Sequence, residues 1–215
     1  MKIICVGRNY AAHAKEMQAE IPQKPVIFMK PDTAVLKPGQ DFYYPDFSKE
    51  IHYECEVFFR IGAEGKYISP KFVYRHIDGI GLGLDLTARD LQQQLKAQGL
   101  PWEIAKAFNG SALISEIYPL RNAGNKNEEG AFIDYKDIQN LHFELKVNGE
   151  LRQRGYTGDW IFPLETLVAY ISQFFTLKTG DLIFTGTPAG VGPIHIGDIL
   201  EGYLQSKKMF TFRVM

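Results

Sequence analysis

The sequence is most informative at His52-Tyr53-Glu54-Cys55-Glu56, which the apolar run Val57-Phe58-Phe59 follows directly. Residues 54–61 have the composition of a β-strand, and side chains two apart in a strand lie on the same face of a sheet. We therefore expect Glu54 and Glu56 to lie side by side at the mouth of a sheet. Because two like charges so close together repel each other, a cation between them would stabilise the pair.

A third acid lies in the next apolar run. Asp85 interrupts residues 80–86, where an unpaired buried charge would be strongly destabilising. Three carboxylates from two strands form the oxygen-rich ligand set that Mg²⁺, Mn²⁺ or Ca²⁺ prefers. The spacing also fits a solvent-facing strand with two glutamates, plus an aspartate that caps the helix that starts nearby. The pattern by itself leaves both interpretations open.

The rest of the chain has the pattern of a strand-rich α+β protein. Further strands are expected at residues 2–6, 26–29, 79–87 and 181–185 and within 200–214. Gly79, Gly81 and Gly83 leave one side of their strand bare for close packing. Asn148-Gly149, between residues 141–147 and 150–153, is a strong signal for a hairpin with a type I′ turn.

Few helices are expected, and most of them are short. The sequence predicts helices at residues 11–19, near 71–76 and at 88–98, with Thr87 as N-cap of the last. The clearest helical periodicity follows Pro163, with apolar residues at 164, 167, 168, 171, 174 and 175. The polar segment 122–130 is predicted to be an exposed loop, because the strands after it have no helical layer for a second core. Residues 1–215 are therefore expected to form one domain.

Composition excludes several classes of protein. The 215 residues contain 24 basic and 25 acidic side chains, a formal charge of −1, so no strong field would attract nucleic acid or an anionic membrane. Cys5 and Cys55 are the only cysteines, too few for a disulfide framework or a multi-thiolate zinc site. No apolar run is long enough to span a membrane, and the start of the chain does not have the pattern of a signal peptide. We expect a cytoplasmic protein.

A second polar group is formed by His13 and Glu16, three apart on the expected helix 11–19 and therefore on one face. A carboxylate beside an imidazole raises its basicity and orients it, as in a general base that activates water. Such a pair is also a common surface contact. Lys106 lies in the apolar segment 104–108 and needs a partner, unless its side chain carries the charge to solvent.

The order of several short motifs resembles the fumarylacetoacetate hydrolase family, in its short acylpyruvase and oxaloacetate decarboxylase branch. The similarity covers residues from about 3 to 214, and the motifs that carry it are Gly7-Arg8-Asn9-Tyr10 with His13 and Glu16, Phe28-Met29-Lys30-Pro31, His52 to Glu56, Leu84 to Asp90, Gly99-Leu100-Pro101-Trp102, Ala105-Lys106-Ala107-Phe108, Val147-Asn148-Gly149-Glu150 and Thr185-Gly186-Thr187-Pro188. The resemblance implies a mixed β-roll, a homodimer, and one Mg²⁺ or Mn²⁺ per subunit.

The same resemblance implies roles for individual residues. The metal ligands would be Glu54, Glu56 and Asp85, and the water-activating pair would be His13 and Glu16. The groups expected to contact the reacting oxygen and water are Lys106 and Gln92, and those expected to hold the substrate are Arg8, Tyr10, Arg89 and Thr187. Cys55 stands where the family often has leucine or valine. Strand alternation would point its thiol away from the metal.

The resemblance implies an enzyme that acts on small anionic 2-keto acids. A 2-keto acid chelates a hard cation through its carboxylate and keto oxygens, which favours an enolate at the adjacent carbon. Hydrolysis of acylpyruvates to pyruvate and a carboxylic acid, and decarboxylation of oxaloacetate, are the favoured reactions. The alternative is an isomerase or tautomerase of oxaloacetate or of 2-hydroxyhepta-2,4-diene-1,7-dioate. A binding module without catalysis is disfavoured, because every expected catalytic position is occupied.

Overall fold

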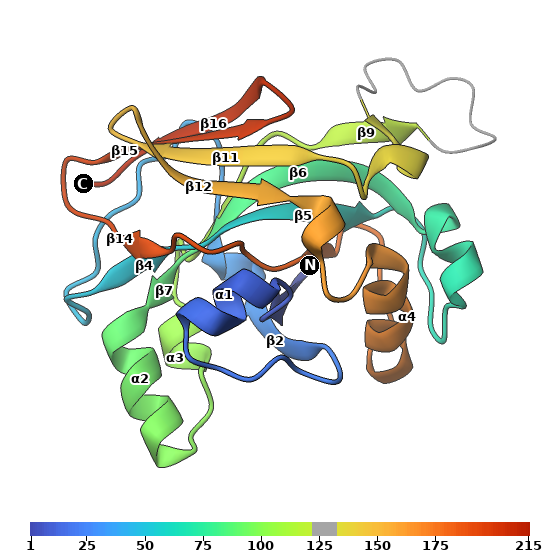
Figure 1. Cartoon of the computed structure of the whole chain (residues 1–215), viewed down its shortest axis with the longest axis horizontal. Coiled ribbons are helices and arrows are strands. Elements are labelled where there is room, and N and C mark those ends of the chain that lie inside the picture. The colour runs from blue at the N-terminus through green and yellow to red at the C-terminus, as the bar shows by residue number, and fades with distance from the viewer. Residues whose placement is uncertain (122–132) are drawn as a thin grey trace.

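Long apolar strands lie at the centre of the molecule, where other elements cover both of their faces. Burial on both faces explains why these strands are apolar along their whole length. The computed structural model describes residues 1–121 and 133–215. Its described part contains a nine-stranded sheet, a four-stranded sheet and a small three-stranded sheet. Figure 1 shows the four-stranded sheet lying over the strands of the large one, with helices α2 (Arg89–Gln98) and α4 (Leu164–Phe174) at opposite ends of the view. The strand-rich α+β prediction is confirmed.

The large sheet is mixed. Its central path runs in the order β10-β9-β6-β5-β13-β1-β2, with β3 paired to β8 and β8 to β6. The pairs β1–β13, β9–β10 and β3–β8 are parallel, and the others are antiparallel. The strands are β1 (Lys2–Gly7), β2 (Val26–Pro31), β3 (Val35–Leu36), β5 (Cys55–Ile61), β6 (Ile77–Asp85), β8 (Ala112–Ile114), β9 (Tyr118–Arg121), β10 (Ile133–Asp134) and β13 (Leu182–Phe184).

The four-stranded sheet is built from two hairpins, in the order β12-β11-β15-β16. The predicted Asn148-Gly149 turn joins β11 to β12, and both residues have positive φ, 53° and 82°. Residues 200–214, predicted to be strand-like, form most of two strands that turn at Gln205 and Ser206, again with positive φ. The strands of this and the small sheet are β4 (Ile51–Tyr53), β7 (Thr87–Ala88), β11 (His142–Val147), β12 (Glu150–Tyr156), β14 (Gly192–Pro193), β15 (Ile199–Leu204) and β16 (Lys207–Arg213).

One hydrophobic core lies between the two larger sheets. Its members include Val57 of β5, Leu82 of β6, Phe143 of β11 and Phe212 of β16, all nearly inaccessible to solvent. Burial of apolar side chains from both layers supplies the main favourable term in folding. The small sheet has the order β14-β4-β7. Its strand β4 ends just before Glu54, and its strand β7 begins just after Asp85.

Three glycines in β6 allow close packing, as the sequence predicts. A Cβ atom at Gly79 would lie 2.6 Å from Ile117, and one at Gly81 would lie 2.3 Å from Phe58. At Gly83 the nearest atom would be the backbone oxygen of Leu113, at 2.5 Å. A flexible side chain can move away from such a contact, but a paired backbone carbonyl cannot. Gly83 is therefore the position of the strand where a side chain is least tolerated.

We expect Gly83→Ala to destabilise the protein by about 3 kcal/mol, the upper range for overpacking a close-packed site. Gly7→Ala is the matched control, because a Cβ atom there would meet its nearest neighbours at an ordinary 3.9 Å. Urea unfolding followed by circular dichroism would give both values. Equal stabilities of the two variants would show that β6 can move away from β8.

The helices differ from the prediction mainly at their ends. The α-helices are α1 (Ala11–Glu16), α2 (Arg89–Gln98), α3 (Glu103–Lys106) and α4 (Leu164–Phe174), and the 3₁₀ helices are η1 (Asp32–Ala34), η2 (Pro70–Arg75), η3 (Tyr135–Asp137) and η4 (Thr157–Asp159). The helix predicted over 11–19 ends at Glu16. The N-cap of α2 is Ala88, so the prediction of Thr87 was wrong. Thr87 instead pairs with His52 in the small sheet.

The predicted loop 122–130 lies outside the described residues. Within the described ranges, no helix is both long and apolar enough to cross a membrane.

Candidate metal centre and active site

Three buried carboxylates from neighbouring strands meet at one end of β5 and β6. Glu54 lies between β4 and β5, Glu56 is the second residue of β5, and Asp85 ends β6. One ligand oxygen from each lies within 4.8 Å of the others. Asp85 N donates to the backbone oxygen of Glu54 at 2.8 Å, which fixes the two chain segments side by side. The structure therefore brings together the three acids selected from the sequence.

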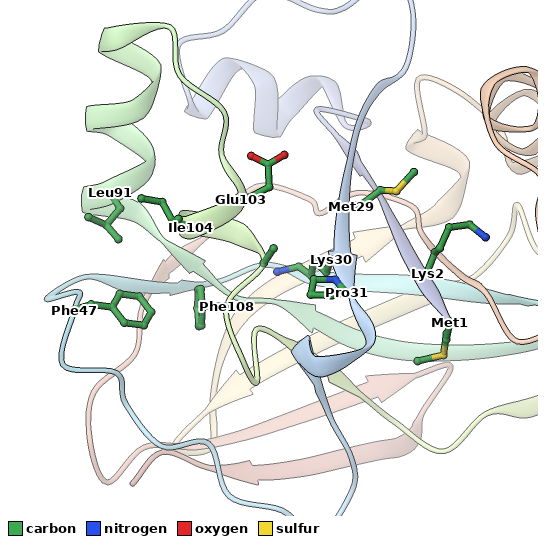
Figure 2. A pocket seen from close by; sticks show the side chains of 11 residues that line it. Met1, Lys2, Met29, Lys30, Pro31, Phe47, Leu91, Glu103, Ile104 and Phe108 are labelled. Atoms are coloured by element: carbon green, nitrogen blue, oxygen red, sulfur yellow. The ribbon is translucent and has the colours of Figure 1, made fainter.

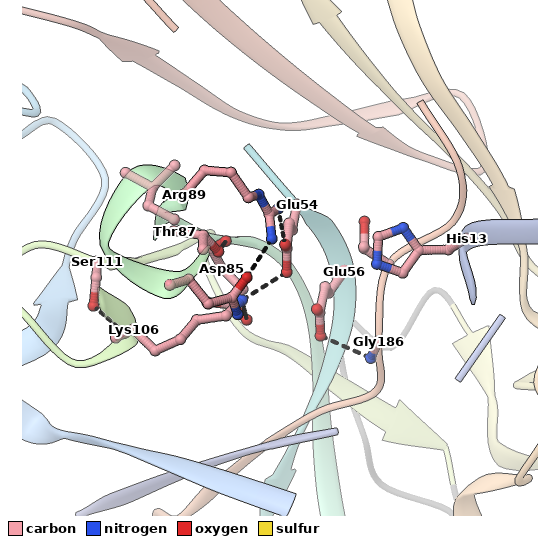
Figure 3. A network of polar contacts seen from close by, with 12 residues as sticks. His13, Glu54, Glu56, Asp85, Thr87, Arg89, Lys106, Ser111 and Gly186 are labelled. Atoms are coloured by element: carbon pink, nitrogen blue, oxygen red, sulfur yellow. Dashed lines mark hydrogen bonds and ion pairs between the residues drawn. The ribbon is translucent and has the colours of Figure 1, made fainter. Parts of the chain in front are cut away.

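Three cationic side chains surround two of these acids, and Figure 3 shows two of them, Arg89 and Lys106. Lys106 Nζ lies 2.8 Å from both Glu54 Oε2 and Asp85 Oδ2. Arg89 Nη2 lies 2.5 Å from Glu54 Oε1. Lys30 Nζ lies 2.7 Å from Asp85 Oδ1, an ion pair without hydrogen-bond geometry. Glu54 and Asp85 are thus each held between two positive charges.

Glu56 has a different environment. Among the described residues its carboxylate accepts one hydrogen bond, from Gly186 N at 2.7 Å, and forms no ion pair. Burial raises the pKa of Glu56 well above its usual range, and the charges of Asp85 and Glu54 raise it further. In the same cluster, burial alone would raise the pKa of Glu54, but Lys106 and Arg89 outweigh it and hold that pKa well below its usual range.

Lys106 remains a cation in this environment. Burial alone would lower its pKa, but the carboxylates of Asp85 and Glu54 raise the pKa of Lys106 above its ordinary value. Its Nζ also lies 4.9 Å from the centre of the Phe28 ring, a cation–π contact. The segment 104–108 therefore buries a charged lysine directed into the acidic cluster, and does not carry it to solvent.

The donor set fits a hard divalent cation. All three candidate ligands are carboxylates, with no thiolate or imidazole within the group, and oxygen donors of this kind select Mg²⁺, Mn²⁺ or Ca²⁺ over softer metals. Glu56, the acid without a cationic partner, is the one whose charge a bound ion would compensate. Glu54, Glu56 and Asp85 are accordingly the residues that would hold such an ion.

His13 and Glu16 form the expected pair on α1. His13 Nδ1 lies 3.2 Å from Glu16 Oε2, and Glu16 Oε1 accepts a hydrogen bond from Gly190 N at 2.9 Å. The carboxylate is therefore fixed between the helix and the turn 186–190, where Gly190 has φ of 96°. Because Glu16 contacts Nδ1, the buried ring can turn Nε2 toward the acids. In Figure 3 His13 lies beyond Glu56, on the side away from Lys106.

A cavity of about 420 Å³ joins these groups. Most of the sequence-predicted site residues line it, namely Arg8, His13, Glu54, Glu56, Asp85, Arg89, Gln92, Lys106 and Thr187. Glu16 and Tyr10 do not. Tyr10 is buried against Phe143 at a ring-centre distance of 6.5 Å, and burial, followed by Glu56, raises the pKa of its hydroxyl. A substrate-binding role for Tyr10 stays a prediction.

Comparison with known proteins places this arrangement in a family. Residues 2–213 match the family described as fumarylacetoacetate (FAA) hydrolase C-terminal. The chain belongs to this family. The mixed β-roll that the sequence resemblance implied is confirmed, since solved structures of the family superpose on the whole chain.

Two curated relatives of this fumarylacetoacetate hydrolase family member are oxaloacetate tautomerases. YcgM from Escherichia coli strain K12 is 43% identical over 199 residues, which cover 93% of this chain and 86% of the relative. The mitochondrial protein FAHD1 of Homo sapiens is 37% identical over 212 residues, with 99% and 90% covered. Family membership therefore makes the chain an enzyme of this superfamily.

Solved structures show two further activities in the family. Fumarylpyruvate hydrolase from Pseudomonas aeruginosa, in complex with Mn²⁺ and pyruvate, has 37% identity and a TM-score of 0.87, covering 100% of this chain and 89% of that one. The 5-carboxymethyl-2-hydroxymuconate delta-isomerase from Mycobacterium smegmatis has 33% identity and a TM-score of 0.81, covering 100% and 78%. Hydrolases and isomerases thus share this fold.

Sequence reasoning missed two buried residues of the family member's site. Besides its ion pair with Asp85, Lys30 Nζ donates to the backbone oxygens of Leu86 at 3.2 Å and Ser111 at 3.1 Å, to Ser111 Oγ at 3.0 Å and to the backbone oxygen of Lys106. A lysine inside the apolar strand β2 was the signal that could have identified it.

Gln153 of β12 is the second missed residue. Its side chain accepts from Cys55 N and donates to Thr187 Oγ1 and Pro188 O, each at 2.9 Å. It connects the four-stranded sheet to the strand that carries Glu56. As expected from strand alternation, the Cys55 side chain packs in the hydrophobic core, away from the acids, and burial raises the pKa of its thiol.

A larger cavity, of about 970 Å³, is lined by Met29, Lys30 and Pro31 of β2 together with residues of the N-terminus and of the segment 103–108 (Figure 2). It is mainly apolar, with Met29, Phe47, Ile104 and Phe108 among its lining residues, and none of the three clustered acids reaches it. The smaller polar cavity is therefore the candidate active site of this fumarylacetoacetate hydrolase family member.

Proposed function

We propose that the chain is an oxaloacetate tautomerase that uses one Mg²⁺ or Mn²⁺ per subunit. The observation that carries the proposal is the buried ammonium of Lys106, held at 2.8 Å from Glu54 and Asp85 on the wall of a small polar cavity. The names of the curated relatives favour tautomerisation over the hydrolysis or decarboxylation that the sequence favours. The Mn²⁺ and pyruvate in the Pseudomonas aeruginosa structure support a metal and a 2-keto acid.

Each polar side chain of the cavity has a separate role in the proposed reaction. His13 accepts a proton from C3 of the keto form while the C2 oxygen takes up one from water. In the reverse direction His13 returns a proton to C3 while the enol oxygen releases its own to water. Lys106 donates a hydrogen bond to the C2 oxygen, where negative charge collects. Arg89 and Thr187 hold the C1 carboxylate, and Gln92 contacts the reacting oxygen. When bound, the cation would supply Lewis-acid stabilisation to the C2 oxygen.

The test is a panel of substrates with Mg²⁺, with Mn²⁺ and with EDTA. Interconversion of enol and keto oxaloacetate can be followed by the ultraviolet absorbance of the enol, and pyruvate release by a coupled assay. We expect fast interconversion that EDTA abolishes. Cleavage of acylpyruvates without any tautomerisation would contradict the proposal.

Hydrolysis of acylpyruvates is the second candidate, and the fixed His13–Glu16 pair favours it. Attack of water on an acyl carbonyl requires a general base held in a fixed orientation toward the water, whereas loss of the C3 proton is already made easier by the hydrogen bond that Lys106 donates to the C2 oxygen. Decarboxylation of oxaloacetate needs no attacking water.

Glu16→Ala separates the two reactions. We expect the variant to lose about a hundredfold in any acylpyruvate cleavage, the lower range for general base catalysis, and only a fewfold in tautomerisation. Lys15→Ala, on the exposed side of the same helix, is the control and should change neither rate. Equal losses in both reactions would show that Glu16 serves one common step.

The proposal includes three further points that rest on the resemblance and the composition. Residues 1–215 act as one catalytic domain, two copies form a homodimer, and the protein works in the cytoplasm on a small anionic ligand. A light-scattering mass decides the second point, and a fluorescent fusion decides the location.

A further inference from the structure

Helix α2 carries three polar residues on the face that borders the active-site cavity. Arg89, Gln92 and Lys96 are three and four residues apart, so they align along one side of the helix, and all three line the cavity. Gln92 Oε1 accepts hydrogen bonds from Arg89 Nη1 at 2.6 Å and from Lys96 Nζ at 3.2 Å. The amide oxygen of Gln92 thus bridges the two cations.

Lys96 occupies the outer end of this row. The residue as a whole is exposed, but its ammonium group reaches back over the helix toward the cavity. There it lies 5.2 Å from the centre of the Trp102 ring. Trp102 lines the same cavity, so its ring fixes the position of the charge at the cavity mouth.

A second cation at the cavity comes from the segment after β1. Arg8 follows β1 and has φ of 60°, a left-handed conformation that is costly for a residue with a side chain. Its side chain lines the cavity. Arg8 and Lys96 are close enough for the charge of Arg8 to lower the pKa of Lys96.

Neither of these cations has an acidic partner in the described part of the chain. Arg89 and Lys106, deeper in the cavity, are paired with Glu54, whereas no ion pair links Arg8 or Lys96 to a carboxylate among residues 1–121 and 133–215. Glu20 also lines the mouth but pairs with neither. Two unpaired like charges held together favour an anion between them.

We propose that Lys96, together with Arg8, binds the second carboxylate of a dicarboxylic substrate and so makes the enzyme selective for 2-keto diacids. The inference rests on the proposed function, in which the 2-keto acid end of the substrate binds beside Glu54, Glu56 and Asp85. It assigns Lys96 as a specificity-determining residue. On the cavity face of α2, Arg89 then binds the reacting part of the substrate, and Lys96 recognises its second carboxylate.

The charge of Lys96 changes in an accessible pH range. Burial, followed by the charges of Arg89, Arg8 and Lys106, lowers the pKa of Lys96 to about 8, while Glu54 opposes the shift. A lysine of this pKa is about nine-tenths charged at pH 7 and about one-tenth charged at pH 9. Binding of a diacid should therefore weaken across this interval, and binding of a monoacid should not. A bound diacid would itself shift the transition to higher pH.

The experiment compares two unreactive ligands by calorimetry on the Mg²⁺-loaded protein. Malate and 2-hydroxybutyrate have the same four-carbon skeleton and the same 2-hydroxy acid end, but only malate has a second carboxylate. We expect Lys96→Met to weaken malate binding about tenfold at pH 7, the effect of losing one charge-assisted hydrogen bond. The affinity for 2-hydroxybutyrate should stay the same. Lys96→Arg should restore malate binding and remove its decline between pH 7 and 9.

Turnover gives a second measurement. In Lys96→Met, KM for oxaloacetate should rise about tenfold with kcat little changed, and Lys178→Met, at an exposed lysine, should leave both unchanged. Equal weakening of malate and 2-hydroxybutyrate would overturn the inference. Failure of the wild type to turn over oxaloacetate would instead overturn the proposed function, and the calorimetric comparison would still decide the role of Lys96.

Discussion

Lys106→Met is expected to lose about a thousandfold in kcat at saturating Mg²⁺, because it removes the buried donor that faces the developing negative charge. Methionine retains most of the volume of the lysine stem, so the cavity keeps its shape. The Nζ of Lys106 touches Glu54 and Asp85 directly, and no other lysine of the described cavity lining does so at both acids. The enol absorbance assay measures the loss.

The same variant should be unstable without metal. Removing one partner of a buried ion pair costs about 3–5 kcal/mol, which for a chain of this size corresponds to a fall in Tm of roughly ten degrees. Excess Mg²⁺ should restore part of the loss, since a dication compensates the same carboxylates. Lys71→Met, at an exposed lysine, is the control. A Lys106→Met protein with normal kcat would remove Lys106 from the reaction.

Glu56→Gln is expected to have the opposite effect on the metal-free protein. Glu56 has two acidic neighbours and no ion pair in the described structure. A glutamine of the same shape retains the oxygen that accepts from Gly186 N and cannot ionise beside its two acidic neighbours. The free energy of unfolding in EDTA should therefore stay the same or rise.

Metal binding by Glu56→Gln should fall at least about a hundredfold, because one of three carboxylate ligands becomes a neutral amide. Mg²⁺ should then no longer raise the Tm, and activity should be lost at any practical concentration of the ion. Glu116→Gln, at an exposed acid, is the control for charge alone. Unchanged Mg²⁺ affinity, measured by calorimetry, would show that Glu56 is not a ligand.

The two variants have opposite signatures. Removal of the cation increases the dependence of stability on metal, and removal of the acid abolishes it. A general loss of folding would not produce this pair of results.

Local sequence patterns were enough to predict the features that depend on short spacings. The pairing of Glu54 with Glu56 follows from strand alternation, and the His13–Glu16 pair from helical spacing. The Asn148-Gly149 hairpin and the tightly packed glycines of β6 likewise depend on few neighbouring residues. The end of α1 depends on backbone conformation, because Gln18 has a left-handed φ of 51° and its N–H bonds to Lys15 O, which turns the chain out of the helix. The sequence pattern therefore extended that helix too far.

The missed site residues have partners far away in the sequence. Lys30 contacts Leu86 and Ser111, and Gln153 contacts Cys55 and Thr187. No periodicity within β2 or β12 indicates which distant backbone atoms these side chains will meet. Lys96 was missed for a related reason. On the sequence it is one more polar residue of an exposed helix, and only the position of Gln92 shows that its charge points back into the cavity.

The parallel pairing of β1 with β13 sets the order in which the protein can mature. Ile3 pairs with Leu182, so β1 cannot complete its place in the sheet until the segment around residue 182 has also left the ribosome. Such long-range pairing makes folding slow. The substrate cavity depends on the same pairing. Arg8 follows β1, Thr187 follows β13, and Glu56 lies in β5, which pairs with β13. The complete substrate cavity should therefore arise late in biosynthesis, in one step with the closed sheet.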